Sequence, residues 1–313
     1  MIKGLALINK YRVLIIFVAL CLVASIVSDS FLTVNNLLNV ARQVSITAII
    51  AAGMTLVILI AGIDLSVGSV LAFTGAVAAG MMTANVPLLV VIPATLIVGL
   101  VFGLVSGLFV TRWGIPSFIT TLAVMVIARG MTLVYTKGYP VVVSNDAFRF
   151  IGNGKLLGIP LPIIIMIAIF GLMYWVLRYT SFGRYTYAIG GNEEAARLSG
   201  IPVNTIKMAV FGISGLLSAL SAIIYTSRLM SAQPTAGTGI ELDAIAAVII
   251  GGTSLAGGKG GITGTLIGAF IMGILDNVLN LMNVSPFYQS IAKGLVILLA
   301  VLVDSKFSKI KTI

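Results

Sequence analysis

Residues 87–110 read PLLVVIPATLIVGLVFGLVSGLFV, a stretch of 24 residues without a single charge. About 20 apolar residues are enough for a helix to cross the hydrocarbon core of a bilayer. Similar stretches recur along the 313-residue chain, of which 59% is hydrophobic and only 9% charged. A soluble globular domain is about 25% charged. The composition therefore argues against a soluble enzyme, a disordered chain and a nucleic-acid-binding domain, and it predicts a polytopic membrane protein.

Ten apolar stretches are candidates for membrane-spanning helices. We expect an all-α protein with about ten transmembrane helices in a single domain over residues 1–313, with no separate soluble domain. The expected spans are 12–28, 42–60, 66–83, 87–110, 117–135, 160–177, 206–228, 241–256, 262–281 and 288–304. The span 241–256 is short, and the link between the second and third spans is very short.

The distribution of basic residues predicts the orientation. With the N-terminus in the cytoplasm, twelve of the nineteen Lys and Arg residues lie on the cytoplasmic side, five lie outside and two lie within spans. The positive-inside rule favours this arrangement over its inverse, so we expect both termini to be cytoplasmic. The basic start and apolar run of the first span also fit a signal peptide, but we expect it to be retained as a span.

The sequence offers few groups for metal binding or catalysis. It contains no histidine and one cysteine, Cys21, so a His ligand, a His base and a Cys metal cluster are excluded. The Gly-rich stretch 252–260 contains a lysine, but Thr253 stands where a P-loop needs glycine and Gly260 where it needs Ser or Thr. We therefore expect no cofactor and no ATP site in this chain.

The most unusual polar segment is 190–202, within the long connection 178–205. Asn192 is a plausible N-cap, Glu193 and Glu194 suit the positive end of a helix, and Gly200 with Pro202 suits a helix end. We therefore predict a short, capped cytoplasmic helix. A short exposed helix gains little from intrinsic propensity. Docking against a partner is favoured over a solvated connector, but both interpretations remain open on the residues alone.

Asp64 lies between the second and third spans. An acid in or near a membrane is a candidate for function, and Asp64 or Ser66 is also a candidate cap for the third span. The segment 61–65 fits a tight cytoplasmic turn or a break in a helix inside the bilayer, a device found near transport pathways.

Three further charged residues lie within predicted spans: Arg129, Asp276 and Lys293. An unpaired charge in a membrane is costly, so we expect Asp276 to pair with Lys293 or Arg129. A hydrated vestibule for a polar solute and a plain ion pair between packed helices are both open. We group these residues with Asp64 and Ser66 as candidates for translocation or gating.

Glycines repeat every fourth position in the span 87–110, at Gly99, Gly103 and Gly107. This spacing places them on one stripe of a helix, where a neighbouring helix can approach closely. The stripe predicts tight helix packing and says nothing about the solute.

Several stretches together resemble the permease subunits of bacterial ABC importers for ribose-type monosaccharides. They are Gly53–Leu59, Gly62–Ser69, Leu198–Ile201, Ser231–Gly239, Glu241–Ala247, Gly251–Gly260 and Leu298–Asp304. The resemblance covers essentially the whole chain after the first thirty residues.

The resemblance implies a ten-helix permease fold that works as a homodimer in the bacterial inner membrane. It also implies cytoplasmic ABC ATPase subunits, a periplasmic or lipid-anchored sugar-binding protein, and a sugar that passes between the two permease subunits. The chain itself is then a transport subunit rather than an enzyme. The resemblance also implies that the subunit is surrounded by membrane lipid and binds no nucleic acid.

The same resemblance identifies an ATPase-contacting loop. Glu194, Ala195, Ala196 and Gly200 match the E-A-A and glycine positions of that loop, while its downstream I-x-L-P part is absent. The predicted coupling residues are Asn192, Glu193, Glu194, Ala195, Ala196, Arg197 and Gly200.

Two further expectations concern the outer face and the energy source. The charges nearest the outer face, which we expect to be exposed and to contact the binding protein, are Arg149, Lys155, Arg228, Glu241 and Asp243. The alternative function is an ion-coupled secondary sugar transporter, whose coupling site would need membrane acids such as Asp64 and Asp276.

Overall fold

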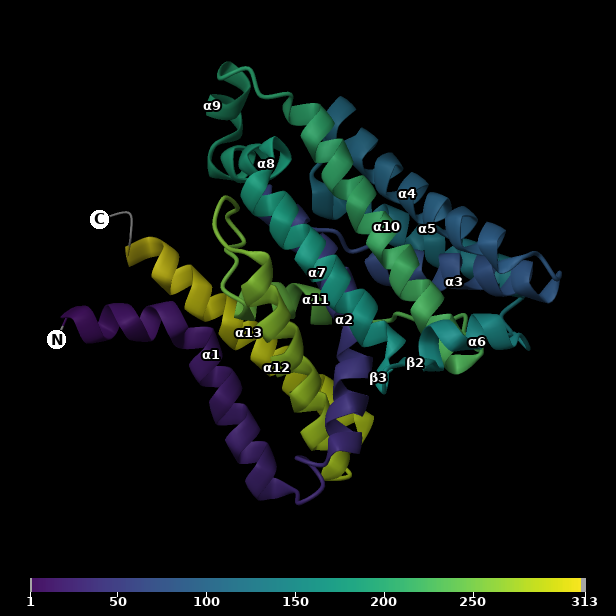
Figure 1. Cartoon of the computed structure of the whole chain (residues 1–313). Helices are drawn as coiled ribbons and strands as arrows, with labels where there is room; N and C mark the ends of the chain where they lie inside the picture. The colour runs from purple at the N-terminus through teal and green to yellow at the C-terminus, as the bar shows by residue number, and fades with distance from the viewer. Residues whose placement is uncertain (1, 311–313) are drawn as a thin grey trace.

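The computed structural model describes residues 2–310 as a bundle of helices of unequal length (Figure 1). Side-chain surroundings are described for residues 13–299 and 301–302. The orientation argument also counts basic residues outside that part of the chain, namely Lys3, Lys10, Arg12, Lys306, Lys309 and Lys311.

The helices follow one another with short links. They are α1 (Ile2–Val27), α2 (Val34–Leu59), α3 (Val67–Thr83), α4 (Leu88–Arg112), α5 (Ser117–Thr136), α6 (Asp146–Asn153), α7 (Leu161–Tyr179), α8 (Ser181–Gly191), α9 (Glu193–Leu198), α10 (Val203–Leu229), α11 (Ile240–Ile250), α12 (Ile262–Leu281) and α13 (Pro286–Ile310). We call the end with α8, α9 and the loop 252–260 the α9 end, and the opposite end, with the α1–α2 link and α6, the far end (Figure 1).

Helices α2 and α10 form the centre of the bundle. From Ile46 to Leu59 every residue of α2 except Thr47 is buried, which explains why this stretch is apolar on all sides. Helix α10 packs against α2, α3, α4 and α6. Because these two helices contact most of the others, a change in either affects the whole bundle.

The predicted glycine stripe on α4 is confirmed as a packing surface. A Cβ on Gly99 would lie 2.4 Å from the carbonyl oxygen of Gly215, and one on Gly103 would lie 2.1 Å from that of Phe211. Both distances are too short for any side chain. The stripe therefore holds α4 directly on the backbone of α10.

The expectation of an all-α membrane protein holds in its main feature, but the count of ten transmembrane helices is not confirmed. Within the described residues, six helices are long and apolar enough to cross a membrane: α2, α4, α5, α7, α10 and α12. Three shorter apolar helices, Val13–Val27, Val67–Thr83 and Pro286–Leu299, coincide with other predicted spans.

The eighth predicted span, 241–256, is wrong in its C-terminal part. Helix α11 has 11 residues, about 16 Å at 1.5 Å per residue, which is too short to cross a bilayer. It ends because Gly251 caps it and Gly252 adopts φ +89°, a conformation that a helix cannot continue through.

The link between α2 and α3 is a non-helical segment that begins at the exposed Ala61 and continues through the buried Gly62 and Asp64. The amide N–H groups of Ile63 and Leu65 donate to the hydroxyls of Ser117 and Thr121 on α5, each over 3.0 Å. Such partners let irregular backbone lie inside a helical bundle. The arrangement favours the interpretation of 61–65 as a break between two helices inside the bundle.

Short strands tie the connections at the far end together. Strand β1 (Val141–Val142) pairs antiparallel with β4 (Ser231–Ala232), and β2 (Lys155–Leu156) pairs with β3 (Ile159–Pro160). The first pair fastens the connection 136–159 to the end of α10.

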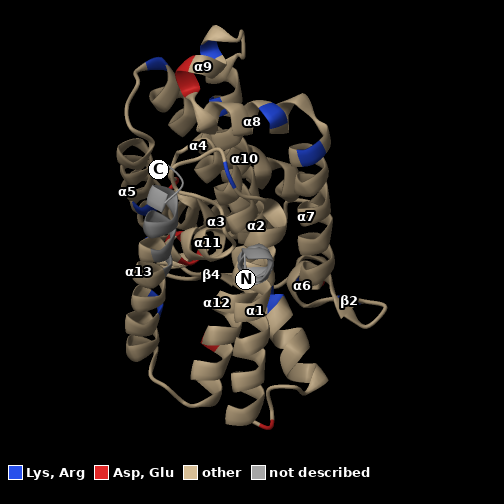
Figure 2. Cartoon of the chain, turned by 90° about the vertical axis from the view of Figure 1, so that its left-hand side faces the viewer, with Lys and Arg blue, Asp and Glu red and all other residues tan. Residues whose placement is uncertain are grey.

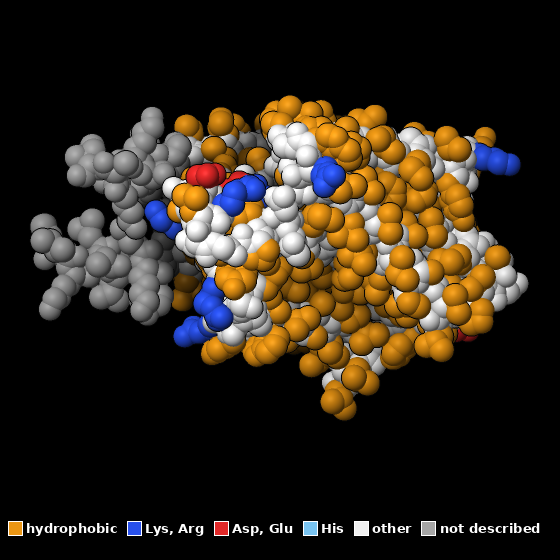
Figure 3. Space-filling model, turned by 90° about the horizontal axis from the view of Figure 1, so that it is seen from above, with side chains coloured by type: hydrophobic (Ala, Val, Ile, Leu, Met, Phe, Trp, Pro, Cys, Tyr) orange, Lys and Arg blue, Asp and Glu red, His pale blue; other side chains and the backbone are white. Residues whose placement is uncertain are grey.

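Charged residues gather around α8 and α9, while the flanks of the bundle carry few (Figure 2). The space-filling view onto the α9 end shows a small number of charged side chains among mostly hydrophobic ones (Figure 3). Apolar flanks with a polar end are what a helix bundle in lipid requires.

Candidate functional site

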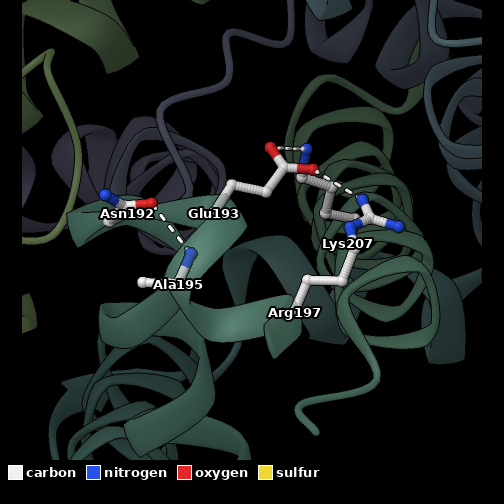
Figure 4. Close-up of polar contacts among 5 residues, drawn as sticks. All are labelled: Asn192, Glu193, Ala195, Arg197 and Lys207. Carbon is white, nitrogen blue, oxygen red and sulfur yellow. Dashed lines mark hydrogen bonds and ion pairs between the residues drawn. The ribbon is translucent and has the colours of Figure 1, made fainter. Parts of the chain in front are cut away.

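Helix α9 is the predicted short helix, and its cap is the predicted one. The Oδ1 of Asn192 accepts a hydrogen bond from the amide of Ala195 over 2.9 Å (Figure 4). Glu193 and Glu194 lie in the first turn, and Gly200 ends the segment with φ +79°. The local sequence therefore specifies this helix through its cap and its stop signal.

Glu193 ties α9 to α10. Its carboxylate contacts Nζ of Lys207 at 2.5 Å and a guanidinium nitrogen of Arg197 at 3.3 Å (Figure 4). Because Glu193 and Arg197 are largely exposed, water screens these pairs and each adds little to stability. Their effect is to fix the direction of α9 relative to the start of α10.

One face of α9 is anchored and the other is free. Ala196 is buried, whereas Glu194 is exposed and Leu198 is 81% exposed. A leucine that projects from a polar helix is a typical contact residue for a partner. We did not include Leu198 among the sequence candidates, although its place at the end of a capped, exposed helix was a usable signal.

Directly beneath α9 three backbone segments meet with no side chain between them. A Cβ on Gly190 of α8 would lie 1.7 Å from the carbonyl oxygen of Leu59 and 2.5 Å from the amide nitrogen of Gly258. Tyr187 also reaches the loop, since its hydroxyl donates to the carbonyl oxygen of Gly260 over 3.0 Å. Burial raises the pKa of Tyr187, which keeps this hydroxyl protonated. We call this contact of Leu59, Gly190 and Gly258 the glycine junction.

The expected pairing of Asp276 with Lys293 is confirmed, and a second carboxylate joins it. The Nζ of Lys293 on α13 lies 3.0 Å from Oδ2 of Asp276 on α12 and 3.0 Å from Oδ2 of Asp243 on α11. Arg129 does not pair with Asp276. Its Nη1 instead donates to the carbonyl oxygens of Pro234 and Ala236, both over 2.8 Å.

Asp64 is enclosed in the bundle with an exposed fraction of 1%. Its Oδ1 accepts from the amide and the hydroxyl of Ser66, and its Oδ2 accepts from the hydroxyl of Ser214 over 2.7 Å. Ser66 occupies the N-cap position of α3, but no side chain caps that helix. Asp64 therefore links the α2–α3 break to α10.

Comparison with known proteins identifies the kind of transport system. Residues 36–301 match the family described as branched-chain amino acid transport system / permease component. The chain belongs to this family of permeases. No solved structure matches it.

The names of several relatives of this permease refer to the transport of sugars. The ribose import permease protein of Haemophilus influenzae is 54% identical over 95% of this chain and 93% of its own length. The Bacillus subtilis ribose import permease protein is 53% identical over 92% of this chain and 90% of its own. The L-arabinose transport system permease protein of Escherichia coli is 39% identical over 97% of this chain and 92% of its own length.

The permease exposes only part of the charge set predicted for the outer face. Arg149 and Lys155 are exposed at the far end, as expected. Arg228, Glu241 and Asp243 are only partly exposed, and their contact with a binding protein stays a prediction. Their exposure is limited because α10 and α11 turn these side chains inward, where Asp243 meets Lys293 and the carboxylate of Glu241 accepts from the amide of Gly239.

Proposed function

We propose that this permease imports ribose, or a related monosaccharide, as the membrane subunit of an ABC importer. The observation that carries the proposal is α9: a capped helix with a free face that projects from an apolar bundle. The names of the most similar relatives supply the solute, since identity of 53–54% extends over nearly the whole chain. The work of transport comes from ATP hydrolysed in a separate subunit, and the permease catalyses no reaction itself.

The mechanism follows from the contacts of α9. A partner ATPase binds its free face, including Glu194 and Leu198, and moves it when ATP closes the ATPase pair. The glycine junction passes this motion to the end of α2, because the backbones of α8, α2 and the loop 252–260 are in direct contact. The bundle then shifts between inward-open and outward-open states, each favoured by a different nucleotide state of the partner.

The partners occupy opposite ends of the molecule. ATPase subunits, separate or fused, bind the α9 end, which lies in the cytoplasm together with both chain termini. A periplasmic or lipid-anchored sugar-binding protein docks at the far end, where Arg149 and Lys155 are exposed. A second copy of the permease completes the pathway in the bacterial inner membrane, and the sugar passes between the two copies.

The charged residues inside the bundle serve gating. Asp64 and Ser66 hold the break between α2 and α3 against α10, and Arg129 holds the segment after β4 against α5. Lys293 connects α13 to α11 and α12 through Asp243 and Asp276. Each of these contacts joins elements that must move apart when the bundle changes state.

Reconstitution tests this function. The permease, its ATPase and its binding protein are placed in proteoliposomes, and uptake of radiolabelled ribose is measured with and without ATP. We expect uptake that stops without ATP and continues when ionophores abolish ion gradients. Uptake that needs an ion gradient and no ATP would establish the secondary-transporter alternative instead.

A further inference from the structure

We propose that a cavity lined by α2, α10, α11 and α12 is a monosaccharide-binding site in each subunit. The proposal rests on the proposed function, because it takes sugar as the solute, and it adds a defined place where one protomer holds that sugar. The cavity has a volume of about 180 Å³. Sites for drug-sized ligands are about 300–1,000 Å³, so this volume suits a smaller solute.

Several polar side chains line the cavity, although most of its surface is apolar. An amide, two hydroxyls, a guanidinium and two carboxylates face it: Gln43 and Thr47 from α2, Tyr225 and Arg228 from α10, Asp243 from α11 and Asp276 from α12. Polar groups inside a membrane bundle are costly and usually mark a solute pathway. A sugar is recognised by this combination of hydrogen-bonding groups beside an aromatic ring.

Charged groups of both signs surround the cavity. Asp243 and Asp276 contribute two carboxylates, and Lys293 contacts both of them. Arg228 lines the cavity and lies close to Arg42, so the basic groups outnumber the carboxylates by one. Lys293 contacts only Oδ2 of Asp276, which leaves Oδ1 of that residue as an acceptor for a hydroxyl group.

Asp276 offers an acceptor that the described part of the chain does not use. Its Oδ2 contacts Lys293, whereas its Oδ1 is buried and has no hydrogen-bond partner among the described residues. Leaving a buried carboxylate oxygen without a donor costs about 1–3 kcal/mol or more. A hydroxyl of a bound sugar would supply the missing donor at this position.

Part of the cavity lining is buried and part reaches the surface. Val44, Ala269 and Met272 line the cavity and are each buried, whereas Gln43 is exposed. A solute therefore reaches the cavity from the side of Gln43.

Binding to the isolated permease tests the site. The full-length permease is placed in lipid nanodiscs without its binding protein, and binding of radiolabelled D-ribose is measured by scintillation proximity, with unlabelled ribose and leucine as competitors. We expect ribose binding that leucine does not displace. Asp276→Asn, Tyr225→Phe and Thr47→Val should each weaken it at least tenfold. The first replaces a charged acceptor by a neutral amide, the other two remove a hydroxyl, and all three keep the shape of the side chain.

A matched control separates loss of the site from loss of the fold. Thr95→Val makes the same substitution as Thr47→Val at a buried position on α4, where the hydroxyl bonds only to the helix carbonyl of Val91. This variant should bind ribose as the unsubstituted permease does. Three results would each overturn the proposal that the cavity binds a monosaccharide. They are absence of ribose binding, unchanged binding in the three cavity variants, and displacement of ribose by leucine.

Uptake by the reconstituted importer distinguishes this proposal from the proposed function. If the unsubstituted importer takes up ribose with ATP and the cavity variants show an unchanged KM for uptake, the site is wrong and the function stands. If no sugar is taken up at all, the proposed function itself fails. Support for both requires uptake by the unsubstituted protein and an impaired KM in variants that retain normal ATPase binding.

Discussion

The amide nitrogen of Gly258 donates a hydrogen bond to the carbonyl oxygen of Leu59 over 2.9 Å. This contact joins the loop after α11 to the end of α2, although the two residues are nearly two hundred positions apart. Gly190 of α8 presses against both partners, so the junction lies between α9 and the centre of the bundle. We therefore expect a movement of α9 to reach α2 through backbone contacts, which deform less than flexible side chains.

Gly190→Ala should disrupt the junction. A Cβ there would lie 1.7 Å from the carbonyl oxygen of Leu59, so the segments must separate. Overpacking of this kind costs about 1–3 kcal/mol. We expect a lower Tm in detergent and less ribose transported per ATP hydrolysed.

Gly191→Ala is the matched control, because a Cβ on that neighbouring glycine meets nothing within 4 Å. It should leave both Tm and coupling unchanged. Equal effects of the two substitutions would mean that the junction does not transmit motion and that helix α8 is merely sensitive to alanine.

Leu198→Ser should weaken binding of the partner ATPase. The side chain is 81% exposed on the free face of α9, and burial of a leucine side chain contributes about 2 kcal/mol, or roughly thirtyfold in affinity. Affinity is measured between ATPase and permease in nanodiscs. Glu194→Ala and Gly200→Ala should lower uptake per ATP in the same preparation.

Leu157→Ser provides the comparison, since Leu157 is 96% exposed in the turn between β2 and β3 at the far end. This substitution should not alter ATPase affinity. If Leu198→Ser and Leu157→Ser behaved alike, α9 would not be the contact surface.

Features encoded locally in the sequence were predictable. Composition and apolar runs predict a membrane helix bundle, the cap at Asn192 and the stop at Gly200 predict α9, and the spacing of Gly99 and Gly103 predicts close packing of α4. Each of these signals depends on residues within one or two helical turns of each other.

Features that depend on distant contacts were not predictable. The early end of α11 is an exception, because its signal, Gly251 and Gly252, is local; it was missed because these glycines lie in an apolar run that hydropathy alone assigns to a span. The cavity requires Thr47, Tyr225 and Asp276 to face one another, which depends on the rotation of three helices. The pairing of Lys293 with Asp243 as well as Asp276 needs the same information.

Lys293→Met should destabilise the permease by about 1–3 kcal/mol, because it leaves two partly buried carboxylates close together without a cation. Unfolding in detergent measures the loss. The triple variant that adds Asp243→Asn and Asp276→Asn should recover most of it, since no uncompensated charge remains. The double variant Lys293→Asp, Asp276→Lys, which only exchanges these two charges, should recover little of the lost stability. In it Asp243 faces a new carboxylate at position 293.

Asp64→Leu should prevent correct assembly of the break between α2 and α3. The substitution keeps a similar volume but removes the acceptor of three hydrogen bonds, from the amide and hydroxyl of Ser66 and the hydroxyl of Ser214, inside a site that is 1% exposed. Each hydrogen bond to a charged group contributes about 1.5–3 kcal/mol, and the donors would be left buried without partners. We expect little folded protein by size-exclusion chromatography.

Ser214→Ala removes a single donor to the same carboxylate and should cost about 1–3 kcal/mol in unfolding free energy while leaving the chain folded. This variant makes the role of Asp64 testable in a protein that can be purified. If Asp64 acts in gating, Ser214→Ala should also change the ATP-dependent uptake rate relative to Ser218→Ala, whose hydroxyl bonds only to the carbonyl of Ser214 in its own helix. Equal uptake by the two variants would restrict Asp64 to a structural role.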